Sequence, residues 1–64
     1  MYRLITIDNE GNKLVVQYGK TFKTNQLLLL RKEAIRWTHI IPECKYYVEN
    51  INNGQIFIIE GVNK

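Results

Sequence analysis

The sequence has no serine, one cysteine and one histidine among its 64 residues. The missing serine excludes a serine nucleophile. A single cysteine, Cys44, excludes a disulfide within the chain, and with only His39 beside it there are too few ligands for a structural zinc site. An unpaired thiol is typical of reducing compartments, so we expect a cytoplasmic protein.

Long apolar runs are also missing, and none exceeds the four residues of a segment such as Leu27–Leu30. A membrane-spanning helix needs about 20 apolar residues. The first residues, Met1-Tyr2-Arg3, do not resemble the start of a secretory signal peptide. We therefore expect no membrane partner and no export.

Groups that carry catalysis are equally scarce. His39 and Cys44 are five residues apart across Pro42, but thiol catalysis also needs an orienting group and an oxyanion site. Glu49 and Glu60 are candidates for a carboxylate pair, which needs a cleft that a small open sheet hardly provides. We predict a protein that is not an enzyme, with no catalytic residue, cofactor, metal or small-molecule substrate.

The residues that are abundant are isoleucine, asparagine and lysine, which make up 22 of the 64. Their codons are rich in A and T, so the composition indicates an AT-rich genome and suggests a small accessory protein of a bacteriophage or mobile element. With 45% apolar residues the chain forms one small domain, residues 1–64. A chain of this length buries only about 60% of its unfolded surface, so its stability is modest.

The alternation of residue types predicts two hairpins flanking a helix. Strands are expected at about 2–7 and 13–18 around a turn at 8–12, and at about 45–51 and 55–60 around Asn53-Gly54, a pair typical of a type I′ turn. A helix is expected at about 24–38, capped by Thr24 or Asn25 and stopped by Pro42. In an alternative, residues 26–30 form a strand and the helix begins at Arg31.

The predicted fold is therefore α+β, in the order ββαββ, with a four-stranded antiparallel sheet and one helix packed on one face. A four-residue first loop would place Ile5 opposite Val16, and the Asn-Gly turn would place Val48 opposite Ile59. The helix would then cover the face formed by Ile5, Ile7, Leu14, Val16, Tyr46, Val48, Phe57 and Ile59.

The other face of this predicted sheet is too apolar for an ordinary wet surface. We predict a protein interface there, used to inhibit or modulate a larger intracellular protein or to form a homodimer. Scattered apolar residues are also common on small sheets, and a one-residue register error would exchange the two faces. The predicted interface residues are Tyr2, Leu4, Val15, Tyr47, Glu49, Ile51, Ile56, Ile58 and Glu60.

Positive charge is concentrated in the central part of the chain, although the net charge is only +3. On a helical wheel Lys32 and Arg36 face outward, whereas Arg31 lies nearer the apolar stripe of Leu27, Leu30, Ala34 and Trp37. A basic helix face can bind phosphates, but it is also an ordinary solvated face. Nucleic acid is therefore an alternative partner, bound by Lys20, Lys23, Arg31, Lys32 and Arg36.

Overall fold

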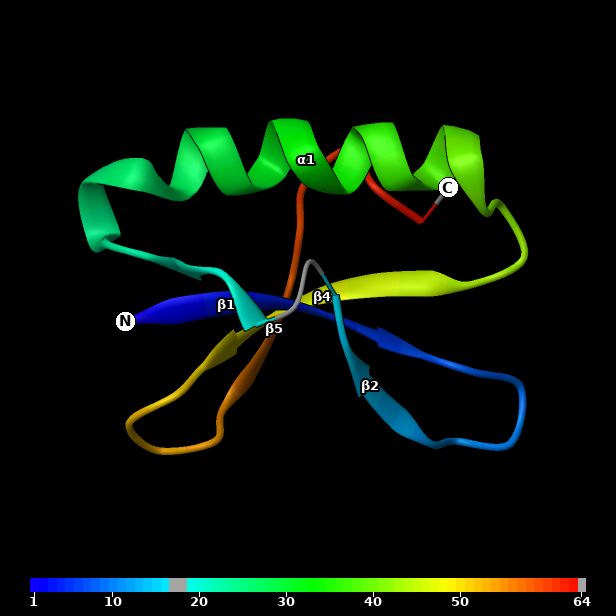
Figure 1. Cartoon of the computed structure of the whole chain (residues 1–64), viewed down its shortest axis with the longest axis horizontal. Coiled ribbons are helices and arrows are strands. Elements are labelled where there is room, and N and C mark those ends of the chain that lie inside the picture. The colour runs from blue at the N-terminus through cyan, green and yellow to red at the C-terminus, as the bar shows by residue number, and fades with distance from the viewer. Residues whose placement is uncertain (17–18, 64) are drawn as a thin grey trace.

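The computed structural model describes residues 1–16 and 19–63, and it confirms the α+β class with one helix packed on an antiparallel sheet. The strands are β1 (Tyr2–Ile7), β2 (Lys13–Val15), β3 (Thr21–Phe22), β4 (Lys45–Asn50) and β5 (Ile56–Ile58). A 3-10 turn, η2 (Thr24–Gln26), leads into the helix α1 (Leu27–Ile40). Helix α1 lies across one side of the sheet, and both hairpin loops point away from it (Figure 1).

The sheet order is β2-β1-β4-β5, with the short β3 also paired to β1. The pairs Ile5–Val15 and Arg3–Thr21 show that β2 and β3 follow the same edge of β1, with a register change of four residues between the two strands. Strand β3 was not predicted, because two residues carry no alternation signal. The predicted end of the second strand at 17–18 lies outside the described residues, and the last two strands are shorter than predicted.

The helix prediction is confirmed in place but not at its start. Residues 24–26 form the 3-10 turn, so the alternative strand at 26–30 is wrong. Gln26 occupies the position before α1 and no side chain caps the helix, so the predicted caps Thr24 and Asn25 are wrong. The predicted apolar stripe does face the sheet: Leu30 and Ala34 are fully buried, and Leu27 and Trp37 pack against the same core.

The first hairpin turns in three residues rather than the four we expected. Gly11 N donates to Asp8 O and Asp8 N donates to Asn12 O, both at 3.1 Å. Gly11 has φ +84°, and the Asp8 carboxylate accepts the N–H groups of Glu10 and Asn12. This is a type I turn closed by a left-handed residue, a common three-residue hairpin loop.

That one-residue difference changes which side chains of β1 face the helix. Ile5 pairs with Val15 instead of Val16, and a shift of one residue moves side chains to the opposite face. Leu4, which pairs with Val48, belongs to the core under α1, and Tyr2 packs against that core. The prediction that Tyr2 and Leu4 lie on the open face, with Ile5 and Ile7 under the helix, is therefore wrong.

The second hairpin also differs from the prediction, without exchanging its faces. Val48 pairs with Phe57 rather than Ile59, because the loop spans residues 51–54. Asn50 N donates to Gln55 O, Gly54 N donates to Asn50 O, and Gly54 takes φ +74°. Asn53 does not adopt a positive φ, so the predicted type I′ turn is wrong. The shift is two residues, and a shift of two keeps each side chain on its face.

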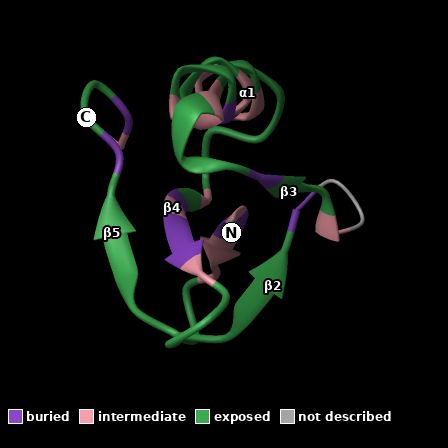
Figure 2. Cartoon of the chain, turned by 90° about the vertical axis from the view of Figure 1, so that its left-hand side faces the viewer, coloured by how far each residue is buried: buried purple, intermediate pink, exposed green. Residues whose placement is uncertain are grey.

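The C-terminal segment completes the core under the helix. Ile59 and Val62 are buried in it, and the Asn63 side chain forms two hydrogen bonds with the main chain of Tyr46. Asn63 Oδ1 accepts the Tyr46 N–H at 2.8 Å, and Asn63 Nδ2 donates to Tyr46 O at 2.6 Å. After β5 the chain therefore turns up toward α1, and β5 remains the outer strand (Figure 2).

Candidate protein interface at the β5 edge

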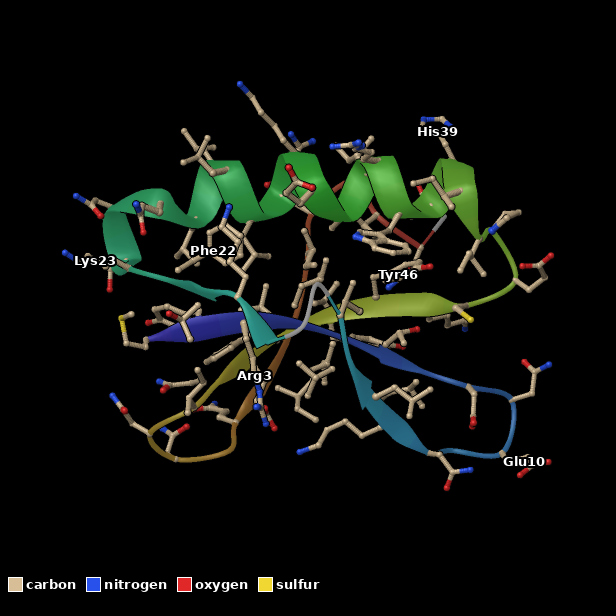
Figure 3. All side chains as sticks on the ribbon, viewed as in Figure 1. Arg3, Glu10, Phe22, Lys23, His39 and Tyr46 are labelled. Carbon is tan, nitrogen blue, oxygen red and sulfur yellow. The ribbon has the colours of Figure 1, made fainter. Side chains whose placement is uncertain are left out.

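The open face of the sheet is charged at its centre, although we predicted it to be an apolar patch. Glu49, 2% exposed, binds Arg3 Nε through one carboxylate oxygen and Lys13 Nζ through the other, both at 2.5 Å. Arg3 hangs from β1 on the side away from α1, whereas Phe22 and Tyr46 lie between sheet and helix (Figure 3). The hydrogen bond from Lys13, and then the one from Arg3, lowers the pKa of the Glu49 carboxyl below its usual range.

The ion pairs have a direct consequence for the predicted interface. The Glu49 carboxylate already has two cationic partners, so it is not available to orient a basic partner surface. It also has no pairing with Glu60, since Glu49 lies opposite Ile56 in the sheet. Glu60 is exposed beyond the end of β5, and the two carboxylates do not form the acid pair considered above.

Most of the remaining predicted interface residues lie on the outer strands or in the second hairpin loop, whereas Tyr47 lies on the inner strand β4. Val15, Ile51, Ile56 and Ile58 are exposed, and Tyr47 is half-buried. Ile58 is the most exposed of them, at 81%. Apolar exposure on this side of the sheet is therefore strongest at β5, not at its centre.

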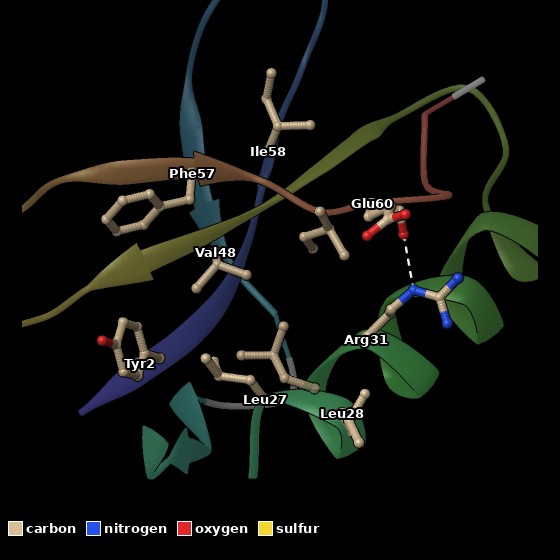
Figure 4. Close-up of a pocket in the computed structure, with 10 residues that line it drawn as sticks. Tyr2, Leu27, Leu28, Arg31, Val48, Phe57, Ile58 and Glu60 are labelled. Carbon is tan, nitrogen blue, oxygen red and sulfur yellow. Dashed lines mark hydrogen bonds between the residues drawn. The ribbon is translucent and has the colours of Figure 1, made fainter. Parts of the chain in front are cut away.

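On the helix side, β5 borders an apolar groove that the sequence did not reveal. The groove encloses about 440 Å³ between β5 and the first half of α1 (Figure 4). Phe57 and Leu28 line it, and they are 40% and 75% exposed. The other lining residues are Tyr2, Leu27, Leu30, Arg31, Val48, Ile58, Ile59 and Glu60.

Phe57 and Leu28 were missed for different reasons. Phe57 was correctly placed on the helix side but was expected to be covered, whereas β5 lies at the border of the sheet where one helix does not cover it. Leu28 lies one position after Leu27 of the apolar stripe and was not singled out. The sequence signal that could have identified it is a leucine on the helix outside the buried stripe, because such a residue remains exposed.

The main chain of β5 also has an unpaired side. Asn50 N donates to Gln55 O, which makes these two a hydrogen-bonded pair of the antiparallel ladder. Such pairs alternate with non-bonded ones, so Phe57 bonds Val48 while the N–H and C=O groups of Ile56 and Ile58 point outward. Within residues 1–16 and 19–63, none pairs with these outward groups.

The predicted nucleic-acid residues do not form one free cationic surface. Arg31 Nε donates to Glu60 O at 2.8 Å and so ties the C-terminal segment to α1. Arg36 lies 3.9 Å from the Glu33 carboxylate, and Lys20 lies over the Phe22 ring at 5.2 Å. Lys23 and Lys32 are also exposed.

His39 and Cys44 line a common hollow of about 580 Å³ between the end of α1 and the C-terminal segment. No hydrogen bond joins them within the part of the chain that the structure describes. The same part of the chain contains no group of three His, Cys, Asp or Glu side chains able to hold a metal ion. Its helices are also too short and too polar to cross a membrane.

Comparisons of the chain with protein-family models, with curated proteins and with solved structures give no match.

Proposed function

We propose that this protein is a non-enzymatic interaction module that binds another protein through the edge of β5. The observation that carries the proposal is the run Ile56-Phe57-Ile58, where three consecutive apolar strand residues are exposed at an unpaired sheet edge. Leu28 extends this apolar surface across the groove to the helix. Contiguous apolar surface of this kind is typical of protein interfaces.

The edge and its two flanks supply different parts of the recognition. An extended segment of the partner would bond the outward N–H and C=O groups of Ile56 and Ile58, as in other cases of strand addition. Phe57 and Leu28 would bury apolar surface on one side of that segment, and Ile58 on the other. Each Å² of apolar surface removed from water favours such an association by about 25 cal/mol, before the entropy and desolvation costs of binding are subtracted.

The consequence for the partner would be steric, because the described part of the proposed interface consists of apolar side chains and main-chain groups. The AT-rich composition supports the hypothesis of a phage-type or mobile-element accessory protein that inhibits or modulates a larger protein. The free thiol of Cys44 supports a reducing, cytoplasmic location.

The test uses two leucines that are neighbours on α1. Leu28 lines the groove and Leu29, also exposed, does not. Tagged wild-type protein is used to recover partners from the source cell, and the affinity of each recovered partner is measured by calorimetry. Leu28→Asp and Ile58→Asp are expected to weaken binding at least tenfold, while Leu29→Asp leaves it unchanged. Equal binding by all variants would reject this surface.

The nucleic-acid alternative predicts a different pattern. Lys32→Glu combined with Arg36→Glu would abolish binding to random duplex at low salt and leave protein binding intact. Since phosphate contacts dominate such binding, any affinity of the wild type should fall steeply as salt increases. Duplex binding that survives this double substitution would exclude the helix face as its site.

A further inference from the structure

We propose that β5 pairs with β5 of a second copy of this chain, antiparallel, with Phe57 on the two-fold axis. This inference rests on the proposed interaction edge and names one protein that fits it. Its tests are chosen so that self-pairing and partner binding fail separately.

The hydrogen-bonding groups of two β5 strands match in this register. With Phe57 on the axis, Ile56 faces Ile58 of the second copy, and Ile58 faces its Ile56. These are the two residues whose N–H and C=O groups point outward from β5. Each of the two pairs can therefore exchange both of its main-chain bonds. Phe57 faces its own copy at a non-bonded position, which suits it because its main-chain groups already bond Val48.

The side chains of the two β5 strands also match in this register. The two Phe57 rings would meet on the helix side at a non-bonded pair, where cross-strand side chains approach most closely. On the other side, each Ile58 would lie against an Ile56. Phe57 and Ile58 are the β5 residues that line the apolar groove, so the pairing would bury apolar surface next to that groove.

No charge repulsion opposes the pairing of two β5 strands. The segment Gln55–Ile59 carries no charged side chain, so no like charges meet in this register. The first charge beyond it, Glu60, would lie opposite Gly54 of the second copy. A strand without charge does not select an acidic or basic peptide, whereas it is compatible with itself.

The opposite edge of the sheet shows what protection against such pairing looks like. There, β2 carries Lys13, the register with β1 changes by four residues between Val15 and Thr21, and Lys20 and Lys23 flank β3. Lysines and irregular register are common devices that block strand addition. Strand β5 carries no lysine, and its pairing with β4 is regular. The two edges therefore differ in the property that decides self-association.

The first experiment is sedimentation equilibrium of the full chain from micromolar to millimolar concentration. We expect a monomer–dimer equilibrium, shifted toward monomer roughly tenfold or more by Ile58→Asp, because a carboxylate would be buried at the pairing. Leu29→Asp, with the same charge change outside the groove, should leave the equilibrium unchanged. A wild type that is monomeric throughout, or a dimer that is insensitive to Ile58→Asp, would overturn the pairing.

The second experiment tests the register without introducing a charge. In a Cys44→Ala background, Phe57→Cys should form a disulfide-linked dimer with oxidised glutathione, since non-bonded pairs bring the Cα atoms to about 4.5 Å. Ile56→Cys alone and Ile58→Cys alone should not, because like positions are too far apart in this register. A mixture of the two should yield the mixed dimer. Cross-linking of Ile56→Cys alone, or none by Phe57→Cys, contradicts the model.

The two proposals are separated by combining these results with partner capture. A strictly monomeric wild type whose partner binding is lost in Ile58→Asp rejects self-pairing and supports the interaction module. A dimer with the expected cross-links and no other partner supports self-pairing and rejects binding to a larger protein.

Discussion

Leu4 and Ile5 are neighbours on β1 and both are inaccessible to solvent, at 1% and 0% exposure, yet they lie on opposite faces of the sheet. Leu4 is buried in the apolar core under α1. Ile5 has no helix above it and lies in register between Val15 and Tyr47. Beside Tyr47 on β4's open face is the carboxylate of Glu49, held by its two cations.

The comparison teaches that an uncovered sheet face need not be an exposed apolar face. At its centre Ile5 is inaccessible to solvent, in register with Val15 and Tyr47 and on the same face as the Glu49 ion pairs. Toward the outer strands the apolar residues of this face are exposed, and Ile58 is the most exposed of them. The candidate interface is therefore displaced from the middle of the open face to its β5 border.

The largest expected effect on the unfolding free energy comes from truncating Leu4, and it should exceed the effect of truncating Ile5. Leu4→Ala should cost about 2–5 kcal/mol of unfolding free energy, because a cavity remains in a core closed by the helix. Ile5→Ala should cost less, about 2 kcal/mol, since the half-exposed Val15 and Tyr47 can move toward the gap. Urea unfolding followed by circular dichroism measures both. If Ile5→Ala proved the more destabilising, the open face would be as tightly packed as the core.

The next effect is removal of the buried charge by Glu49→Gln. We expect a loss of about 1–3 kcal/mol at pH 7, since the substitution removes charge-assisted hydrogen bonds to Arg3 and Lys13. The loss is limited because both cations are partly exposed and can turn to water. An unchanged unfolding free energy would mean that the ion pairs only offset the burial of the carboxylate.

The same carboxylate predicts a pH dependence. Its folded pKa lies below the value of 4.5 for an ordinary glutamate, so the unfolded state binds more protons as the pH falls through this range. The stability contribution is complete above about pH 4.5 and is lost as the pH falls through the folded pKa. Urea midpoints between pH 7 and pH 3 should fall more steeply for the wild type than for Glu49→Gln. The remaining slope includes Asp8, whose pKa is lowered mainly by the Asn12 N–H.

The smallest effect is expected for Lys13→Met. The Lys13 side chain is about half exposed and Arg3 still neutralises Glu49, so the cost should be below about 1 kcal/mol. High salt should weaken the wild type slightly and the variant less. A cost larger than that of Glu49→Gln would show that Lys13 acts through packing of its aliphatic stem rather than through charge.

Particular residues show how far the sequence predicted this molecule. Strand β1 agrees with the prediction over 2–7, and the stripe through Leu30 and Ala34 does face the sheet. Of the predicted interface, Ile56 and Ile58 are exposed, but Leu4 is in the core and Glu49 is buried in ion pairs. The exposure of Phe57 and Leu28 was not predicted, because it depends on where the single helix lies over the sheet.

The sequence by itself determined the order of the two hairpins and the helix, because turn residues and the spacing of apolar residues act over a few positions. Only the tertiary structure decided which face of β1 is covered. That outcome depends on one residue in the first hairpin loop, where Asp8 and Gly11 make a three-residue turn. Since strand side chains alternate with a period of two, that residue exchanged Leu4 with Ile5 relative to the prediction. The exposed apolar surface lies at β5 because the single helix does not cover that border of the sheet.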